Sequence, residues 1–388
     1  METKAIYAVS GDPWTKGHTD IVKRALEIFD QVIVAIGVNP KKNYAFPLYV
    51  RKAMAECSLE KLNTPWATRV EVTSFEGLLV DYAYMRGIKT LIRGIRDDID
   101  FNFERSMFQV NITQKGIDEI FLLPSPQYEH ISSSAVRELQ KNQGNITEYV
   151  DLRVKQAMEV RLSDQRIVGI TGAIGAGKSY MAERLCDAGR KLYPSMGFHN
   201  IELDAIGKSL LTENTLPFAL EMRQSLIEEL GEHLMINRQD EHCFINVKEL
   251  SMAIFGDKES LDVYNKYSEG PILFEMQQRL RGKTGLIFIN SALLIEAKAT
   301  ALCNNNLIIV SADNAFRMES LRKRGYSLGE ADARMHAQMN QTHKIETFRR
   351  ILEEDPGNLV IIENAFGRDT NIILEGYLKT IFHMAAGI

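Results

Sequence analysis

Residues 166–179 read RIVGITGAIGAGKS. An apolar run leads into a glycine-rich turn that fits the pattern G-x-x-x-x-G-K-[ST], and a helical pattern follows it. In this strand–turn–helix context, backbone N–H groups surround phosphate groups, the lysine reaches the terminal phosphates and the hydroxyl binds Mg²⁺. The stretch therefore predicts an ATP-binding loop with a magnesium ligand at Ser179, built from Gly172, Gly175, Gly177, Lys178 and Ser179.

The position of this loop in the chain predicts two domains. The chain has 388 residues, and a typical domain has roughly 100 to 200. A helical pattern ends at the short polar stretch 163–165, and the strand of the loop starts directly after it. We therefore expect one domain over residues 1–164 and a second over residues 165–388.

Both halves alternate apolar strand-like runs with helical patterns. Runs such as VIVAI (32–36) are apolar on both faces, which is typical of a central parallel strand covered by helices on each side. The sequence thus predicts an α/β fold with two parallel sheets, a Rossmann-like domain followed by a P-loop domain. The expected strands span 4–9, 31–38, 70–75, 90–95 and 119–124, then 166–172, 200–204, 286–294, 306–312 and 358–364.

The composition argues against several classes of partner. The formal net charge is -5, whereas a broad nucleic-acid surface needs a basic face. No apolar stretch approaches the roughly 18 residues of a membrane span, and the N-terminal run is too short for a signal peptide. The four cysteines are far apart, as expected of free thiols in a reducing cytoplasm. We therefore expect a cytoplasmic protein without nucleic-acid or membrane partners.

An acidic pair follows the second expected strand of the back half. Glu202 and Asp204 stand at its end, where an acid accepts a substrate proton, holds the water shell of magnesium or caps a helix. The residues alone leave these readings open. Together with SALLIEA (291–297) and RKRGYSLGEADARMHAQM (322–339), the loop and the acids resemble the dephospho-coenzyme A kinases.

This resemblance implies roles for three residues outside the loop. Asp204 would be the base that activates a ribose 3′-hydroxyl, Arg324 would close over phosphates from a lid, and Asn364 would lie near the adenine. The half also departs from the family. Gly270 and Ala292 stand where the family has histidine and proline, and Glu202 replaces the first aspartate of its D-A-D motif.

Two stretches of the front half combine hydroxyls with groups that bind phosphate. SGDPWTKGH (10–18) ends in a T-x-G-H pattern, where we expect a strand to end near Val9 and a helix to start after His18. ISSSAVRE (131–138) places three serines before a helical pattern. Imidazole and hydroxyl groups at helix N-termini bind phosphates, and they also serve as ordinary helix caps.

Both stretches, together with RGIRDDIDFNFE (93–104), resemble the phosphopantetheine adenylyltransferases among the nucleotidylyltransferases. The resemblance implies that His18 stabilises charge on the ATP phosphates while Lys42 and Arg93 clamp the reacting groups. Ser10 would bind the incoming phosphate, and Leu78 and Leu79 would line the pantetheine arm. The residues implied to hold ATP are Arg96, Glu104, Ser132, Ser133 and Ser134. Two departures lie at the start of this region, where Val9, just before the first stretch, replaces a glycine and Gly11 replaces an aromatic residue.

The two resemblances fall on consecutive steps of one pathway, the arrangement of a bifunctional coenzyme A synthase. The ligands implied are ATP, 4′-phosphopantetheine, dephospho-coenzyme A and coenzyme A, with Mg²⁺ as cofactor, and the resemblance allows a homo-oligomer. Two alternatives stay open. One is a nicotinamide mononucleotide adenylyltransferase joined to a ribosylnicotinamide kinase, and the other is an adenylyltransferase whose kinase half is inactive and senses nucleotides.

Overall fold

The chain divides into two compact units, each considered by itself below. One unit contains Met1–Ser163 with Ala386–Ile388, and the other contains Asp164–Ala385. The computed structural model describes residues 2–387 except 41, 63–64, 97, 99–100, 103–104, 106–115, 237–242, 338 and 365–369. The side chains of 255–256, 333–334, 336–337 and 370–373 are also outside the description.

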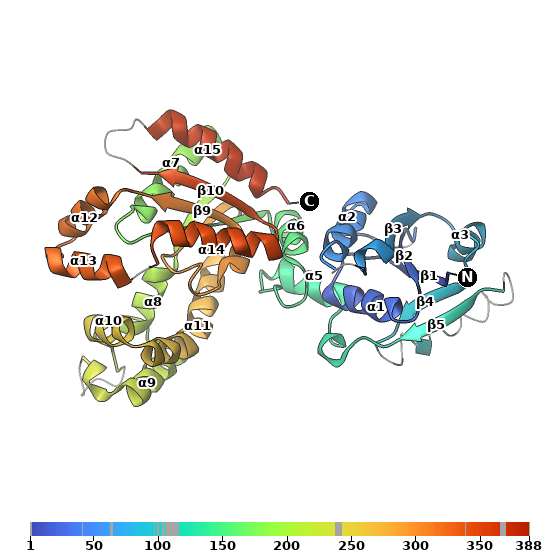
Figure 1. Cartoon of the computed structure of the whole chain (residues 1–388), viewed down its shortest axis with the longest axis horizontal. Coiled ribbons are helices and arrows are strands. Elements are labelled where there is room, and N and C mark those ends of the chain that lie inside the picture. The colour runs from blue at the N-terminus through green and yellow to red at the C-terminus, as the bar shows by residue number, and fades with distance from the viewer. Residues whose placement is uncertain are drawn as a thin grey trace. The chain divides into compact units, whose positions relative to one another are not determined.

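The described part of the first unit contains one five-stranded parallel sheet (Figure 1). Its strand order is β3-β2-β1-β4-β5, so the chain starts in the middle of the sheet and adds strands on either side. The strands are β1 (Lys4–Val9), β2 (Gln31–Gly37), β3 (Val70–Phe75), β4 (Thr90–Gly94) and β5 (Asp118–Leu122). The helices are α1 (Lys16–Leu26), α2 (Leu48–Leu59), α3 (Leu79–Met85), α5 (Ser133–Lys141) and α6 (Leu152–Ser163), with short 3₁₀ turns at Ala67–Arg69 and Pro126–Tyr128.

The two faces of this sheet carry separate apolar cores. Alternate residues of β2 point to opposite faces, and Val32 to Ile36 are all buried. Val34 packs with α1 and with Trp14 on one face, whereas Ile33 packs with Val80 of α3 on the other. The predicted central strand, apolar on both faces, is therefore confirmed.

The described part of the second unit contains another five-stranded parallel sheet, with the order β10-β9-β6-β8-β7. The strands are β6 (Gln165–Gly172), β7 (Phe198–Glu202), β8 (Gly285–Asn290), β9 (Asn306–Ser311) and β10 (Asn358–Glu363). The helices are α7 (Lys178–Leu192), α8 (Leu203–Thr212), α9 (Pro217–Leu230), α10 (Val247–Gly256), α11 (Lys258–Leu280), α12 (Asn314–Lys323), α13 (Leu328–Ala337), α14 (Gln341–Glu354) and α15 (Thr370–Met384), with 3₁₀ turns at Glu232–Leu234 and Thr300–Cys303.

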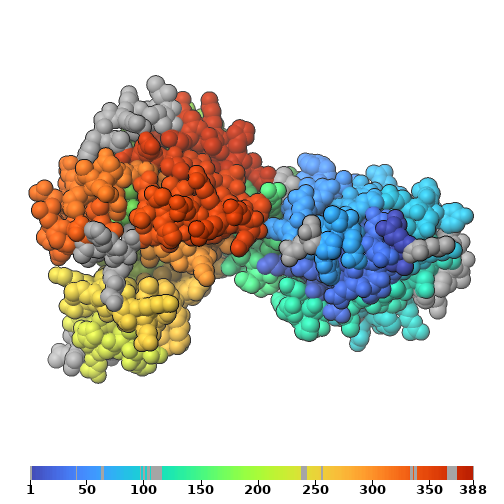
Figure 2. All heavy atoms as spheres, in the orientation of Figure 1, coloured from blue at the N-terminus to red at the C-terminus, as the bar shows by residue number. Residues whose placement is uncertain are grey.

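Helices α9, α10 and α11 pack together as a lobe of the second unit, coloured yellow-green to yellow in Figure 2. Helix α15 instead packs on α7 beside the sheet. Both sheets are parallel and flanked by helices, which confirms the predicted α/β fold class. In the part of the chain that the structure describes, no helix is both long enough and apolar enough to cross a bilayer.

Two expected strand boundaries near the site are wrong. The strand expected over 286–294 ends at Asn290. We expected a strand over 200–204 with Asp204 at its end, but β7 stops at Glu202 and α8 begins at Leu203. The helix starts there because Leu203, Ile206 and Leu210 recur at helical spacing and are buried against the core. Asp204 therefore lies in the first turn of α8, and the helix holds its backbone in a fixed position.

Two candidate active sites

A cavity of about 790 Å³ lies at the carboxyl ends of β1, β2 and β4 in the first unit. Ligands bind at this edge in open parallel sheets, because the strands end there and the helices that follow present their N-termini. The cavity wall includes the predicted residues Ser10, His18, Lys42, Leu78, Leu79, Arg93, Arg96, Ser132, Ser133 and Ser134. Glu104, predicted to hold ATP, lies outside the described residues.

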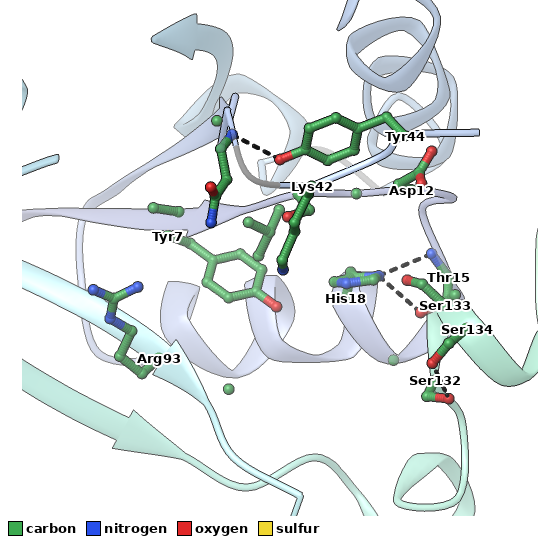
Figure 3. A pocket seen from close by; sticks show the side chains of 18 of the residues that line it. Tyr7, Asp12, Thr15, His18, Lys42, Tyr44, Arg93, Ser132, Ser133 and Ser134 are labelled. Atoms are coloured by element: carbon green, nitrogen blue, oxygen red, sulfur yellow. Dashed lines mark hydrogen bonds between the residues drawn. The ribbon is translucent and has the colours of Figure 1, made fainter. Parts of the chain in front are cut away.

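Thr15 and His18 are joined at the start of α1. The Thr15 backbone N–H donates to His18 Nδ1 at 3.0 Å, and Thr15 Oγ1 lies 2.8 Å from the same nitrogen (Figure 3). This is the reciprocal pattern of a capping box, with an imidazole in place of the usual glutamate. The helix therefore begins at Lys16, and our expectation that it starts after His18 is wrong.

The capping bond also decides the tautomer of His18. Because Nδ1 accepts the Thr15 N–H, a neutral imidazole must carry its proton on Nε2. Burial, aided by the charge of Arg96, lowers the pKa of His18 to about 4. The ring of Trp14 lies beside the imidazole, with the ring centroids 5.0 Å apart. His18 therefore presents a neutral Nε2–H donor at neutral pH.

We expect His18 to stay neutral with its proton on Nε2 throughout the range from pH 8 down to about 5. The reason is that a folded-state pKa near 4 lies well below the unperturbed value of 6.5, so protonation begins only in more acidic solution. Two-dimensional NMR of ¹⁵N-histidine-labelled protein measures this directly, with the signal assigned by its loss in His18→Gln. A His18 signal that titrates near pH 6.5 would contradict the expectation.

Two arginines, of which Arg51 is buried, and a buried aspartate organise the loop before α1, and the sequence did not single them out. Asp12 accepts the backbone N–H groups of Ala45 and Phe46, both at 3.0 Å, and pairs with Arg137 of α5 at 3.3 Å. Arg51 donates to the carbonyl oxygen of Ser10, and to that of Gly37 at 3.0 Å. Arg51 gave no signal because a single arginine in a helical pattern is usually a surface residue.

The three predicted serines do different things. Ser132 caps α5 by accepting the Ala135 N–H at 3.1 Å, while Ser133 donates to the carbonyl oxygen of Pro13 at 2.8 Å. Ser134 is exposed and lies 3.4 Å from Ser132 Oγ. The helix-cap reading is therefore confirmed for Ser132, and the phosphate-binding reading stays a prediction for three serines that all line the cavity.

The remaining cations reach the same cavity from β4 and from the loops that follow β2 and β4. Figure 3 shows Lys42 and Tyr7 directed into the space beside His18, with Arg93 entering from β4. The Arg93 guanidinium lies 3.4 Å from the buried carboxylate of Glu119, which holds it in place. Arg96 is exposed at the cavity wall. The cavity thus combines several positive charges with a neutral donor, a set suited to phosphate groups.

The glycine that departs from the adenylyltransferase pattern sits beside a bulky neighbour. Gly11 has a φ of +59°, and a Cβ added to it would lie 3.7 Å from the Trp14 ring and 3.4 Å from Ile36. Trp14 is fully buried in that space. A side chain at position 11 would have to adopt this left-handed conformation and lie against Trp14 and Ile36.

In the second unit, the glycine-rich loop joins β6 to α7. A Cβ at Gly172 would lie 2.3 Å from the carbonyl oxygen of Val310, and one at Gly177 would lie 2.4 Å from Asn364 Nδ2. Gly177 also has a φ of +86°, in the left-handed region. Val310 and Asn364 therefore admit only glycine at these positions, and the glycines let the loop curl tightly between β6 and α7.

The loop is also held from outside by two side chains. Asn364 Nδ2 donates to the carbonyl oxygen of Ala176, and Arg317 Nε donates to that of Ile174, both at 2.9 Å. Asn364 was predicted to lie near adenine, and its described contact is with the loop itself. Arg317 went unnoticed in the sequence, because nothing in its own segment indicates a contact 143 residues away.

Lys178 lies among groups of both signs. Burial lowers the pKa of its amino group, as do Lys344 and Arg324, whereas Asp204 and Glu202 raise it. Arg324, the predicted lid residue, is exposed at the end of α12. Arg324 and both acids thus act electrostatically on the loop lysine, which places the predicted site residues close enough to interact.

The predicted metal ligand and the first acid share one neighbour. Asn290 Nδ2 lies 3.4 Å from Ser179 Oγ and 3.2 Å from Glu202 Oε1. Asn290 and Glu202 are also paired residues in the β7–β8 register. A hydroxyl and a carboxylate facing one amide form a set of oxygen donors that fits Mg²⁺ or its water shell.

Comparison with known proteins agrees with this division of the chain. A family model described as dephospho-CoA kinase matches residues 166–359, and one described as cytidylyltransferase-like matches residues 10–139. Two phosphopantetheine adenylyltransferases resemble the front half. The one from Alkaliphilus metalliredigens is 42% identical over 154 residues, and that alignment covers 39% of this chain and 95% of the relative. The one from Haemophilus ducreyi is 38% identical over 166 residues, and that alignment covers 42% of this chain and 100% of the relative.

Among solved structures, TT1252 from Thermus thermophilus aligns with 56% of this chain and 96% of its own, at 24% identity and a TM-score of 0.38. A score that low adds nothing to the sequence matches. The family model covers half of the chain and the adenylyltransferases align over nearly their whole length. The chain therefore belongs to the phosphopantetheine adenylyltransferase family in its front half and to the dephospho-CoA kinase family in its back half.

Proposed function

We propose that the chain catalyses the last two steps of coenzyme A synthesis. The front half transfers an adenylyl group from ATP to 4′-phosphopantetheine, which gives dephospho-coenzyme A and pyrophosphate. The back half transfers the γ-phosphoryl group of a second ATP to the ribose 3′-hydroxyl. The observation that carries the proposal is the presence on one chain of two sets of groups suited to phosphate, one in each unit, in families that act in sequence.

The first reaction needs no general base, because the attacking phosphate is already an anion. Its oxygen attacks the α-phosphorus of ATP, and the bond to pyrophosphate breaks. The neutral Nε2–H of His18 donates to the oxygens where charge accumulates, while Lys42 and Arg93 hold the phosphates in line. Catalysis is then positioning together with electrostatic stabilisation of the transition state.

The second reaction moves a proton as well as a phosphoryl group. The oxygen of the 3′-hydroxyl attacks the γ-phosphorus while Asp204 accepts the hydroxyl proton, the bond from the γ-phosphorus to the bridging oxygen breaks, and ADP leaves. Lys178 neutralises charge on the phosphates. Ser179 would hold Mg²⁺, and Glu202 would hold water around it. The metal would supply charge neutralisation on the ATP phosphates. The departures at Gly270 and Ala292 leave all of these groups in place.

We also propose that the protein acts in the cytoplasm on small phosphorylated ligands. A consumer of ATP with four free cysteines, three of them buried, suits a reducing cytoplasm. The net charge of -5 suits small phosphorylated ligands bound at local basic clusters better than a nucleic acid. We also propose a closed homo-oligomer, as the adenylyltransferase resemblance suggests.

Mass spectrometry of the purified full chain with 4′-phosphopantetheine and MgATP tests the function. We expect dephospho-coenzyme A to appear first and coenzyme A to follow, because both sites lie on one chain and each has its phosphate-binding groups. Accumulation of dephospho-coenzyme A without coenzyme A would point to an inactive, nucleotide-sensing kinase half. Turnover of nicotinamide mononucleotide in place of 4′-phosphopantetheine would favour the nicotinamide alternative and contradict the proposal.

A further inference from the structure

Two adjacent residues at the end of β8 each hold one of the two acids. Strand β8 lies between β6, which leads into the glycine-rich loop, and β7, which leads to the acids. Asn290 contacts Glu202 on the magnesium side, as described above. Ser291, the next residue, contacts Asp204. The end of β8 therefore lies between the phosphate-binding loop and the proposed base.

The contact with Asp204 uses both oxygens of its carboxylate. Ser291 Oγ donates to Oδ1 at 2.9 Å, and the backbone N–H of Ala292 approaches Oδ2 at 3.4 Å. The Leu293 N–H in turn donates to Ser291 Oγ at 3.2 Å, so the hydroxyl's own hydrogen is directed to the carboxylate. The second donor exists because residue 292 is alanine, since a proline there would have no N–H.

The serine is itself held firmly. Its backbone N–H donates to the carbonyl oxygen of Ile170 at 3.1 Å, which extends the pairing with β6. The carbonyl oxygen of Ala292 accepts from Lys344 Nζ at 2.8 Å and from Thr171 Oγ1 at 3.3 Å. Ser291 is only 6% exposed, whereas Asp204 is exposed. The rigidly held Ser291 hydroxyl thus fixes the orientation of the Asp204 carboxylate, which is otherwise exposed to solvent.

From this geometry we propose that Ser291 is a positioning residue for the kinase reaction, and that it acts through Asp204. The inference rests on the proposed function of the back half. An exposed aspartate without a fixed partner samples several rotamers, and a base is useful only when its free lone pair meets the substrate hydroxyl. The Ser291 hydroxyl restricts the carboxylate to one orientation before dephospho-coenzyme A arrives.

The test compares Ser291→Ala, Ser291→Thr and a matched control, Ser311→Ala, in the full-length protein. Ser311 is also a buried serine at the end of a strand of this sheet, but its hydroxyl accepts from Gln341 rather than contacting an acid. For Ser291→Ala we expect the kinase kcat to fall about 10- to 100-fold, with the KM values for ATP and dephospho-coenzyme A within about two-fold of wild type. Threonine keeps the hydroxyl, so Ser291→Thr is expected to stay within about five-fold of wild type.

The adenylyl-transfer rate of each preparation controls for folding and concentration. An unchanged kcat in Ser291→Ala, a loss confined to KM, a failure of threonine to rescue, or an equal loss in Ser311→Ala would each overturn the positioning role. A wild-type chain that does not phosphorylate dephospho-coenzyme A would overturn the proposed kinase function, and this inference with it. An active wild type with an unimpaired Ser291→Ala would overturn the inference alone.

Discussion

His18→Ala is expected to lower the rate of adenylyl transfer about 10³-fold. The substitution removes the Nε2–H donor that we propose stabilises the charge developing on the phosphate oxygens as pyrophosphate leaves. A loss of that size corresponds to about 4 kcal/mol of transition-state stabilisation. His18 contributes this donor without a change of protonation, since its neutral tautomer is set by Thr15 and its pKa is held at about 4. Pyrophosphate release with 4′-phosphopantetheine and MgATP measures the effect.

His130→Ala is the matched control for this substitution. His130 belongs to the same unit, is exposed and stacks edge-on to Tyr149, but it does not line the cavity. We expect its adenylyl transfer to match wild type. Phosphorylation of added dephospho-coenzyme A should be normal in both variants. Near-normal adenylyl transfer in His18→Ala would refute the front-site assignment.

Lys178→Ala is expected to lower phosphorylation of dephospho-coenzyme A by about 10³-fold or more, because no other loop side chain neutralises the transferred phosphoryl group. The effect should be large for a second reason. Burial already lowers the pKa of the Lys178 amino group, so the free site bears a cation that is poorly solvated and binds an anion readily. Conversion of dephospho-coenzyme A to coenzyme A, followed by mass spectrometry, measures the loss.

The control is Lys191→Ala, an exposed lysine at the far end of the same helix α7. We expect it to leave both activities unchanged. In Lys178→Ala the chain should still convert 4′-phosphopantetheine to dephospho-coenzyme A and then stop. Unaltered kinase activity in Lys178→Ala would contradict the loop assignment and favour a nucleotide-sensing role for the back half.

Local patterns predicted most of the fold. The apolar runs of β1 and β3 were expected at 4–9 and 70–75, and the structure has both strands at those residues. The glycine loop was identified from eight adjacent residues, because the chain can only curl around a phosphate where glycines relieve the backbone. The boundary errors at α1 and α8 arose where a helix start depends on a side-chain cap or on burial of the first turn.

Some site residues lie in local sequence motifs, whereas others are defined by a contact with a residue far away in the sequence. His18 and Lys178 lie in short motifs whose chemistry can be recognised from neighbours in the sequence. The contact of Ser291 with Asp204 spans 87 residues, that of Arg137 with Asp12 spans 125, and that of Asn364 with Ala176 spans 188. No local pattern marks such partners, because a serine or arginine gains its role only from the group that packing places opposite it.

The sequence by itself therefore determined the α/β organisation and the pair of families, and it predicted two phosphate-binding motifs, since periodicity and motif spacing are properties of contiguous residues. The tertiary structure alone decided the bracing of the glycine loop by Asn364 and the hold of Ser291 on Asp204. These depend on how parallel strands bring their carboxyl ends to one edge of a sheet, where residues distant in the chain come within hydrogen-bonding distance.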